Sequence, residues 1–200
     1  MSIDIFDVDE IDSILRQRIR EGREVNLKEF DIPVYEIDPV YTTEEFRFSP
    51  ERNIYLRQVR STIEPISVKA EESGFDHNVF TALYEAVLNA HQHGNKKAPD
   101  KKVILAHNIE EETARFAVVD EGGMIDPEFI SFVLRHREKR HKEDGERKGK
   151  ILDFYRFIGK DKPEYNNGTG TSFIHMYMDG VSYFKYIGGG LALHLTKKKK

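Results

Sequence analysis

The chain of 200 residues contains no cysteine. Disulfide bonds, cysteine-based metal sites and a cysteine nucleophile are therefore excluded. No apolar run approaches the roughly 20 residues that a helix needs to cross a bilayer. The first residues, MSIDIFDVDEIDS, are acidic, whereas a signal peptide begins with basic residues. From these absences we expect a soluble, cytoplasmic protein that has no membrane partner.

Charge is distributed unevenly along the chain, although the net charge is only −4. Residues 1–46 contain 13 acidic and 5 basic side chains, whereas residues 135–150 contain 8 basic and 4 acidic ones. Blocks of this kind are usually solvated surface or mobile tails. The basic block has no interleaved aromatic residues and no known binding motif, so we expect no direct binding to nucleic acid.

The length suits one domain with extensions. Residues 1–43 are predicted to form an acidic N-terminal extension, which includes a short amphipathic helix at Ile11–Arg23. Residues 44–196 are predicted to form the folded domain, with a long basic segment at about residues 128–167. The last four lysines, residues 197–200, are predicted to be a disordered tail.

Apolar periodicity and turn residues predict the elements of this domain. After the short strand EFRFSP, helices are predicted from Ser49 to Gly74 and from Asp76 to Gly94, each ended by its glycine. Two strands, KKVILAHNI and TARFAVVDEG, are followed by helices near residues 128–137 and after NNGTGTS, and a hairpin closes the chain. This order predicts an α/β two-layer sandwich with helices packed on one face of a mostly antiparallel mixed sheet.

The first of three polar clusters is EAVLNAHQHGN. Glu85, Asn89 and His93 recur every four residues and so share one face of the predicted helix. Taken alone, such a row is more often a solvated face than a site. Asn89 offers a neutral oxygen to a hard cation such as Mg²⁺, and Glu85 can deprotonate a hydroxyl beside it. His91 and His93 are two apart and point to different sides, so we expect no shared metal ion.

The second cluster, VVDEGG, lies where a predicted strand runs into a loop. The Asp120 carboxylate can accept a hydrogen bond from an exocyclic amine such as that of adenine. Gly122 lets a flat ring approach the backbone. Taken alone, Asp and Gly here are also what an ordinary turn uses.

The third cluster, NNGTGTS, precedes a predicted helix. Gly168 and Gly170 free the backbone to wrap phosphates, and Thr171 and Ser172 place donors at the helix start, which is a ready anion site. A flexible loop with a good N-cap explains this cluster alone equally well. The order and spacing of all three clusters together favour a nucleotide site.

These clusters resemble the N box and the two glycine boxes of the GHKL ATPase superfamily, which includes gyrase B, the heat-shock chaperone ATPase, histidine kinases and mismatch-repair ATPases. The similarity is greatest to the anti-sigma factor serine/threonine kinases, and it is carried by the segments EAVLNAHQHG, VVDEGGMIDP and FIHMYMDGVSY. The resemblance covers about residues 44–196 and implies the Bergerat ATP-binding fold.

The resemblance implies ATP and Mg²⁺ as cofactors and makes residues 128–167 a lid over the nucleotide. It also implies a role for each matching position: general base for Glu85, Mg²⁺ ligand for Asn89, a place near the phosphates for His93 and Gly94, recognition of the adenine amine for Asp120, a place beneath the base for Gly122, and shaping of the phosphate loop and lid hinge for Gly168 and Gly170.

The sequence departs from the family pattern at three places. Met124 stands where the first glycine box usually ends in glycine, with Gly123 just before it. The lid is longer and more basic than in the small anti-sigma kinases. In the last hairpin, Leu191 and Ala192 stand where a Thr often follows the turn glycine.

The resemblance implies an ATP-dependent serine/threonine protein kinase of the anti-sigma type. Its expected partners are an antagonist protein with an acceptor Ser or Thr, a sigma factor or other regulatory client, and a second copy of the chain. A non-catalytic GHKL nucleotide-binding module is the alternative, favoured by Met124 and the lid, whereas the presence of both Glu85 and Asn89 favours catalysis. A histidine-kinase ATPase domain ranks last, because no dimerisation helix with a phospho-accepting His is evident upstream.

Overall fold

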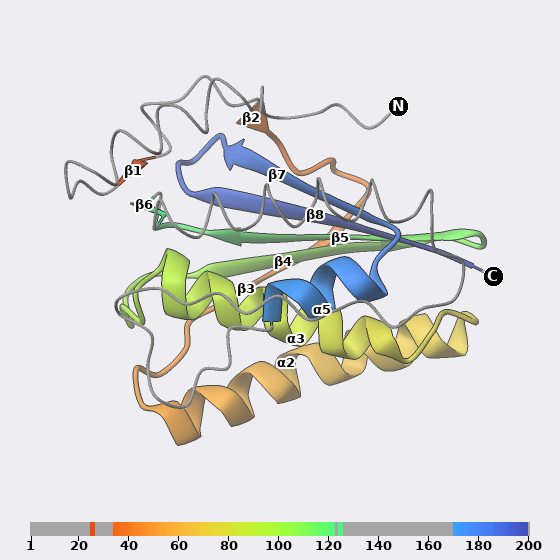
Figure 1. The fold of residues 1–200 in the computed structure, drawn as a ribbon, viewed down its shortest axis with the longest axis horizontal. Coiled ribbons are helices and arrows are strands. Elements are labelled where there is room, and N and C mark those ends of the chain that lie inside the picture. Colours follow the sequence, from red (N-terminus) through yellow and green to blue (C-terminus); the bar gives the residue numbers. More distant parts are fainter. Residues whose placement is uncertain (1–24, 27–33, 123, 126–169, 200) are drawn as a thin grey trace.

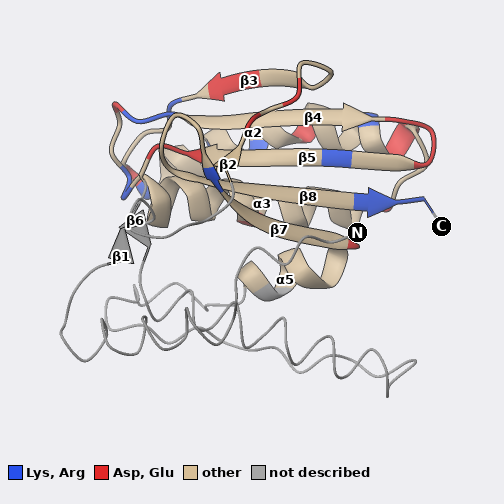
Figure 2. Cartoon of the chain, turned by 90° about the horizontal axis from the view of Figure 1, so that it is seen from above, with Lys and Arg blue, Asp and Glu red and all other residues tan. Residues whose placement is uncertain are grey.

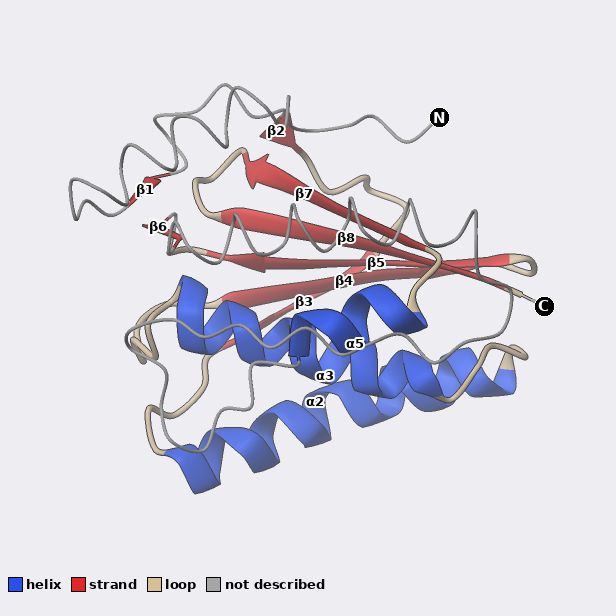
Figure 3. Cartoon of the chain, in the orientation of Figure 1, coloured by secondary structure: helices blue, strands red, loops and turns tan. Residues whose placement is uncertain are grey.

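The computed structural model describes residues 25–26, 34–122, 124–125 and 170–199, and the structural statements below refer to these residues. Within them, a six-stranded sheet carries three α-helices on one face (Figures 1 and 3). The predicted α/β two-layer sandwich is therefore confirmed. None of the described helices is both long and apolar enough to cross a membrane.

The order of the strands in the large sheet is β2-β7-β8-β5-β4-β3. β2 pairs with β7 in parallel, and the other neighbours pair antiparallel. A separate two-stranded sheet joins β1 to β6. The strands are β1 Val25–Asn26, β2 Val34–Tyr35, β3 Thr42–Phe46, β4 Val103–Ile109, β5 Thr113–Asp120, β6 Met124–Ile125, β7 Gly180–Tyr186 and β8 Leu191–Lys198.

Two hairpins supply the centre of the sheet, as predicted. In the β4–β5 hairpin, the Glu110 N–H donates to the Thr113 carbonyl (3.0 Å) across the acidic turn. In the β7–β8 hairpin, Gly189 and Gly190 have φ values of 86° and 99°. Residues with a side chain rarely adopt such positive φ angles, so this turn requires glycine.

The helices are α2 Arg52–Glu72, α3 Asn78–Asn89 and α5 Gly170–Tyr177, and a π-turn, η2 Ala90–Gly94, continues α3. α2 ends at Glu72, and the predicted stop, Gly74, lies just beyond it with a φ of 88°. The predicted N-cap, Ser49, lies too early. Its hydroxyl oxygen instead accepts the Glu51 N–H (3.1 Å) in the turn before the helix.

The core lies between the helices and the sheet. Burying each large apolar side chain there contributes about 1.5–3 kcal/mol relative to leaving it exposed. Tight packing of these side chains fixes where α3 and α5 lie on the sheet. The largest fully buried apolar side chains are Tyr55, Ile63, Leu83, Leu105, Phe116, Ile174, Met178 and Leu195.

The chain segment between β2 and β3 crosses the helix-free face of the sheet, because these strands lie at opposite edges (Figure 1). Figure 2 views the molecule from this side. The Tyr35 ring lies 5.3 Å from that of Phe184, and the Tyr41 hydroxyl is 3.0 Å from His194 Nε2. Residues 34–43, assigned to the N-terminal extension from sequence, thus contribute to the sheet of the domain, and the expected boundary at residue 44 falls inside β3.

The end of the chain differs from the prediction. Lys197 and Lys198 are the last residues of β8, so the expected disordered tail is wrong for them. Lys197 is buried, and its Nζ donates to the Tyr177 carbonyl at the end of α5 (2.7 Å). The predicted helices at Ile11–Arg23 and 128–137, and the lid at 128–167, lie outside the described residues.

Candidate functional site

α3 places Glu85 and Asn89 one turn apart on one face, and both are half-buried. The chain reaches His93 through the π-turn, where the Asn95 N–H donates to the Ala90 carbonyl (2.8 Å). His93 is exposed. The regular α-helical part of the predicted row therefore consists of Glu85 and Asn89. Single π-turns within α-helices occur frequently at functional sites.

The Glu85 carboxyl lies against the start of α5. A Cβ added at Gly170, the first residue of that helix, would collide with Glu85 Oε2. Burial raises the pKa of Glu85. The first and third clusters of the sequence therefore meet here. Thr171, the next residue of α5, is buried.

Two predicted residues of the third cluster cannot be placed in full. Ser172 belongs to α5, but its side chain is outside what the structure describes. Gly168 lies in the undescribed segment before the helix.

Asp120, the last residue of β5, is buried where three segments of the chain converge. Its Oδ1 accepts the N–H of Gly122 (2.9 Å) and, at longer range, that of Leu191 (3.4 Å). A Cβ at Gly94 would collide with the Asp120 carboxylate, and one at Gly190 would collide with its carbonyl oxygen. The N box, the first glycine box and the β7–β8 turn thus meet at one carboxylate.

Gly94 is required for a reason other than the expected helix cap, and Gly122 has a structural reason of its own. Gly94 is absent from the residues with positive φ, so it is not a left-handed helix cap. It is required because the Asp120 carboxylate occupies the space of its missing side chain. Gly122 in turn faces the carbonyl oxygen of Gly94, with which a Cβ would collide. Both glycines allow a close approach of two loops.

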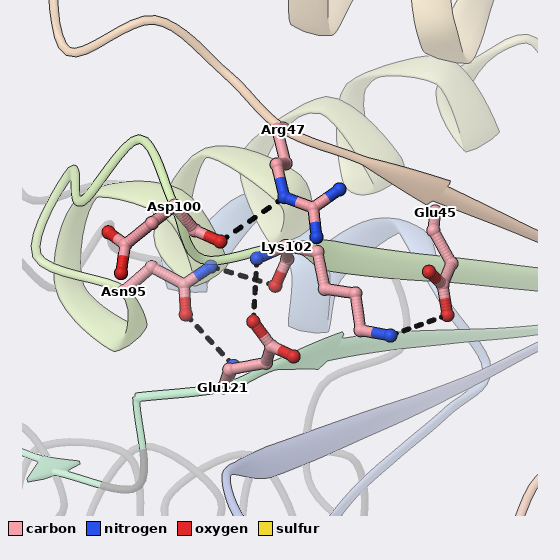
Figure 4. Close-up of polar contacts among 6 residues, drawn as sticks. All are labelled: Glu45, Arg47, Asn95, Asp100, Lys102 and Glu121. Atoms are coloured by element: carbon pink, nitrogen blue, oxygen red, sulfur yellow. Dashed lines mark hydrogen bonds and ion pairs between the residues drawn. The ribbon is translucent and has the colours of Figure 1, made fainter.

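A polar network missed by the sequence reasoning joins these loops (Figure 4). Asn95 is fully buried, its Nδ2 donates to the Lys102 carbonyl (2.9 Å), and its Oδ1 accepts the Glu121 N–H (2.9 Å). The Lys102 N–H donates to Glu121 Oε2 (2.8 Å), and Lys102 Nζ donates to Glu45 Oε1 on β3 (2.7 Å). No sequence signal distinguishes Asn95, because Asn after a helix-ending glycine also suits any turn.

His91 is a fully buried scaffold residue. Its Nε2 lies 3.1 Å from the Ser49 carbonyl, and its ring packs edge-on to Phe48 and Tyr55. Burial lowers the pKa of His91. His91 is fully buried while His93 is exposed, so the two rings face different surroundings. In the described part of the chain, no group of three His, Cys, Asp or Glu residues is arranged to hold a metal ion.

A mixed sheet with helices on one face, and with the three clusters gathered at the ends of α3 and β5 and the start of α5, defines an ATP-binding domain of the GHKL type. The family model of the histidine kinase-like ATPase domain matches residues 49–197. The chain therefore belongs to the histidine kinase-like ATPase family. A search of curated proteins returns no match.

Proposed function

We propose that this domain binds Mg·ATP and transfers the γ-phosphoryl group to a Ser or Thr of a partner protein. The observation that carries the proposal is Glu85, a half-buried carboxyl of raised pKa one helical turn before Asn89. A general base works best when its pKa approaches the working pH. Burial moves Glu85 in that direction, whereas a domain that only binds nucleotide has no need of a desolvated carboxylate.

We assign the remaining roles by the same reasoning. Asn89 would offer its side-chain oxygen to Mg²⁺, which favours oxygen ligands and neutralises phosphate charge when bound. The start of α5, at Gly170 and Thr171, would bind phosphate oxygens through backbone N–H groups. Glu85 lies beside this helix start and would take the proton of the acceptor hydroxyl.

The adenine end of the site would be read by Asp120. A carboxylate has about four acceptor positions, and the two loop N–H groups on Oδ1 hold this one in place. The Asp120 carboxylate would then accept a hydrogen bond from the exocyclic amine of adenine. Ser172 and Gly168 would contribute to the phosphate end of the site, as the glycine-rich sequence before α5 suggests, and Gly94 lies against the Asp120 carboxylate. The place of His93 near the phosphates rests on the family resemblance.

The proposed partners are those of the anti-sigma kinases: an antagonist protein carrying the acceptor hydroxyl, and a sigma factor or similar client. A second copy of the chain is a further candidate partner. The excess of acidic residues in the sequence of residues 1–46 would favour a partner with basic residues.

A non-catalytic binding module is the second candidate. The observation that favours it is Met124, which occupies a glycine-box position and lies in β6, paired with Asn26 of β1. This pairing fixes backbone that a glycine would leave free.

Incubation with γ-labelled ATP, Mg²⁺ and candidate antagonist proteins separates the two functions. The kinase predicts label on a Ser or Thr of one partner with the wild type, and none with Glu85→Ala or Asn89→Ala. ATP binding without transfer to any partner would leave the binding module as the function.

A further inference from the structure

Asn95 connects the end of the N box to the loop that carries Asp120. It is fully buried, and both ends of its side-chain amide are used: Nδ2 donates to the Lys102 carbonyl and Oδ1 accepts the Glu121 N–H, each at 2.9 Å. Figure 4 shows the amide lying between the two backbone segments. Because both partners are backbone groups, the amide joins the main chain of one segment directly to that of the other.

The contact lies next to the adenine-reading carboxylate. Glu121 directly follows Asp120, and Gly122 donates to Asp120 Oδ1 (2.9 Å). On the other side, Gly94 precedes Asn95 and packs on that same carboxylate, while Gly122 faces the Gly94 carbonyl. The amide of Asn95 therefore holds together segments of the chain that flank the Asp120 carboxylate.

We propose that Asn95 is a positioning residue for base selectivity: it holds the Asp120 loop so that the carboxylate meets the amine of adenine. This inference rests on the nucleotide site of the proposed function, but not on phosphoryl transfer. Asn95 touches no substrate in this account and acts through Asp120. Its loss would free the loop to shift, and the preference for a base with a 6-amino group would fall.

The test compares the affinities of the full chain for ATP and for inosine triphosphate, which carries a carbonyl in place of the 6-amino group. Sites built to hydrogen-bond a substrate group reject analogues that lack it, so the wild type is expected to prefer ATP at least about tenfold. Asn95→Ala is expected to lower this ratio at least about fivefold. Asn95→Asp keeps an oxygen for the Glu121 N–H and is expected to retain more of the ratio than Asn95→Ala.

Ser67→Ala is the matched control, because Ser67 is also buried and its hydroxyl donates to the Glu64 carbonyl (2.9 Å) in α2, outside the site. Its selectivity ratio should equal that of the wild type. Thermal unfolding of each variant checks the fold. Should Asn95→Ala fail to fold, Asn95→Ser replaces it, because the shorter side chain cannot span Lys102 and Glu121.

An unchanged ratio in the folded Asn95 variant, or equal loss of affinity for both nucleotides, would overturn the proposal. If Asn95→Ala lowers the selectivity ratio but the wild type transfers no phosphoryl group, the role of Asn95 is supported and only the proposed kinase activity is contradicted. A wild type that binds ATP without any preference over inosine triphosphate would overturn it while leaving phosphoryl transfer open.

Discussion

The carboxylate of Glu85 occupies the space that a side chain on Gly170 would fill, because a Cβ there would collide with Glu85 Oε2. Gly170 is the first residue of α5, and Glu85 lies in the middle of α3. The colliding atom is the end of a flexible side chain rather than backbone. A methyl group at residue 170 would therefore displace the carboxylate more readily than the helix.

We therefore expect Gly170→Ala to lower phosphoryl transfer at least about tenfold, because the proposed base moves away from the acceptor hydroxyl. The free energy of unfolding should change by less than about 1 kcal/mol, since Ala suits a helix better than Gly. Label transfer and denaturant unfolding measure the two effects. Gly188→Ala, in the β7–β8 turn, is the control and should leave transfer unchanged. Full activity in Gly170→Ala would show that the carboxylate position is unimportant.

Glu85 should also make stability depend on pH. Burial raises the pKa of Glu85 in the folded state above its ordinary value of 4.5, so the folded state binds this proton more tightly than the unfolded state. Ionisation of Glu85 therefore lowers the stability of the fold as the pH rises from about 4.5 through the pKa of the folded state. Glu85→Gln is therefore expected to raise the melting temperature by a few degrees at pH 8.

The gain in Glu85→Gln should disappear below pH 4.5, where the wild-type carboxyl is protonated in both states. Glu64→Gln, at an exposed position of α2, serves as the control for loss of one charge. Melting curves between pH 4 and pH 8 provide the measurement. A lower melting temperature for Glu85→Gln at pH 8 would mean that the carboxylate is stabilised by its surroundings.

Lys197 should stabilise the fold, in contrast to the disordered tail that the sequence predicts. Its buried Nζ donates to the Tyr177 carbonyl (2.7 Å), which satisfies the C-terminal end of α5. Lys197→Met should lower the free energy of unfolding by about 1.5–3 kcal/mol, as hydrogen bonds to charged groups are worth. The neighbouring Lys198 is exposed, so Lys198→Met should change little. Equal effects of the two substitutions in denaturant unfolding would argue against the buried contact.

Much of the fold could be predicted because its signals are local. The β4–β5 hairpin is marked by two apolar runs around an acidic turn, and the β7–β8 hairpin by Gly188–Gly190. The end of α2 is marked by Gly74. Glu85 and Asn89 could be placed on one face because a regular helix fixes their separation.

The remaining features depend on contacts between distant parts of the chain. β2 is only two residues long and pairs in parallel with β7, and no periodic pattern announces so short a strand. Asn95 gains its partners only when Lys102 and Glu121 approach. The sequence predicts a tail at residues 197–200 because a run of lysines does not reveal that Lys197 has a carbonyl partner on α5.

His194 should make the helix-free face sensitive to acid. Burial, followed by the nearby charge of Arg115, lowers its pKa below 6.5, and its Nε2 lies 3.0 Å from the Tyr41 hydroxyl. The folded state therefore binds the proton less tightly, so stability is present above pH 6.5 and is lost as the pH falls through the folded pKa.

His194→Gln is accordingly expected to reduce the loss of melting temperature between pH 7.5 and pH 5. Part of the loss should remain, because burial lowers the pKa of His91 and His107 as well. His77→Gln, at a side chain that is 81% exposed, is the control and should follow the wild type. If the melting temperatures of His194→Gln and the wild type fall equally in acid, protonation of His194 does not contribute to the loss of stability.

In the proposed mechanism, Glu85 acts as the base in phosphoryl transfer rather than as a ligand of the nucleotide. The most direct measurement determines ATP affinity and label transfer together in Glu85→Gln, which keeps the size of the side chain and removes its basicity. We expect an affinity within about threefold of that of the wild type and a transfer rate lower by about 10²–10⁴-fold. Undiminished transfer in Glu85→Gln, with ATP still bound, would contradict this mechanism.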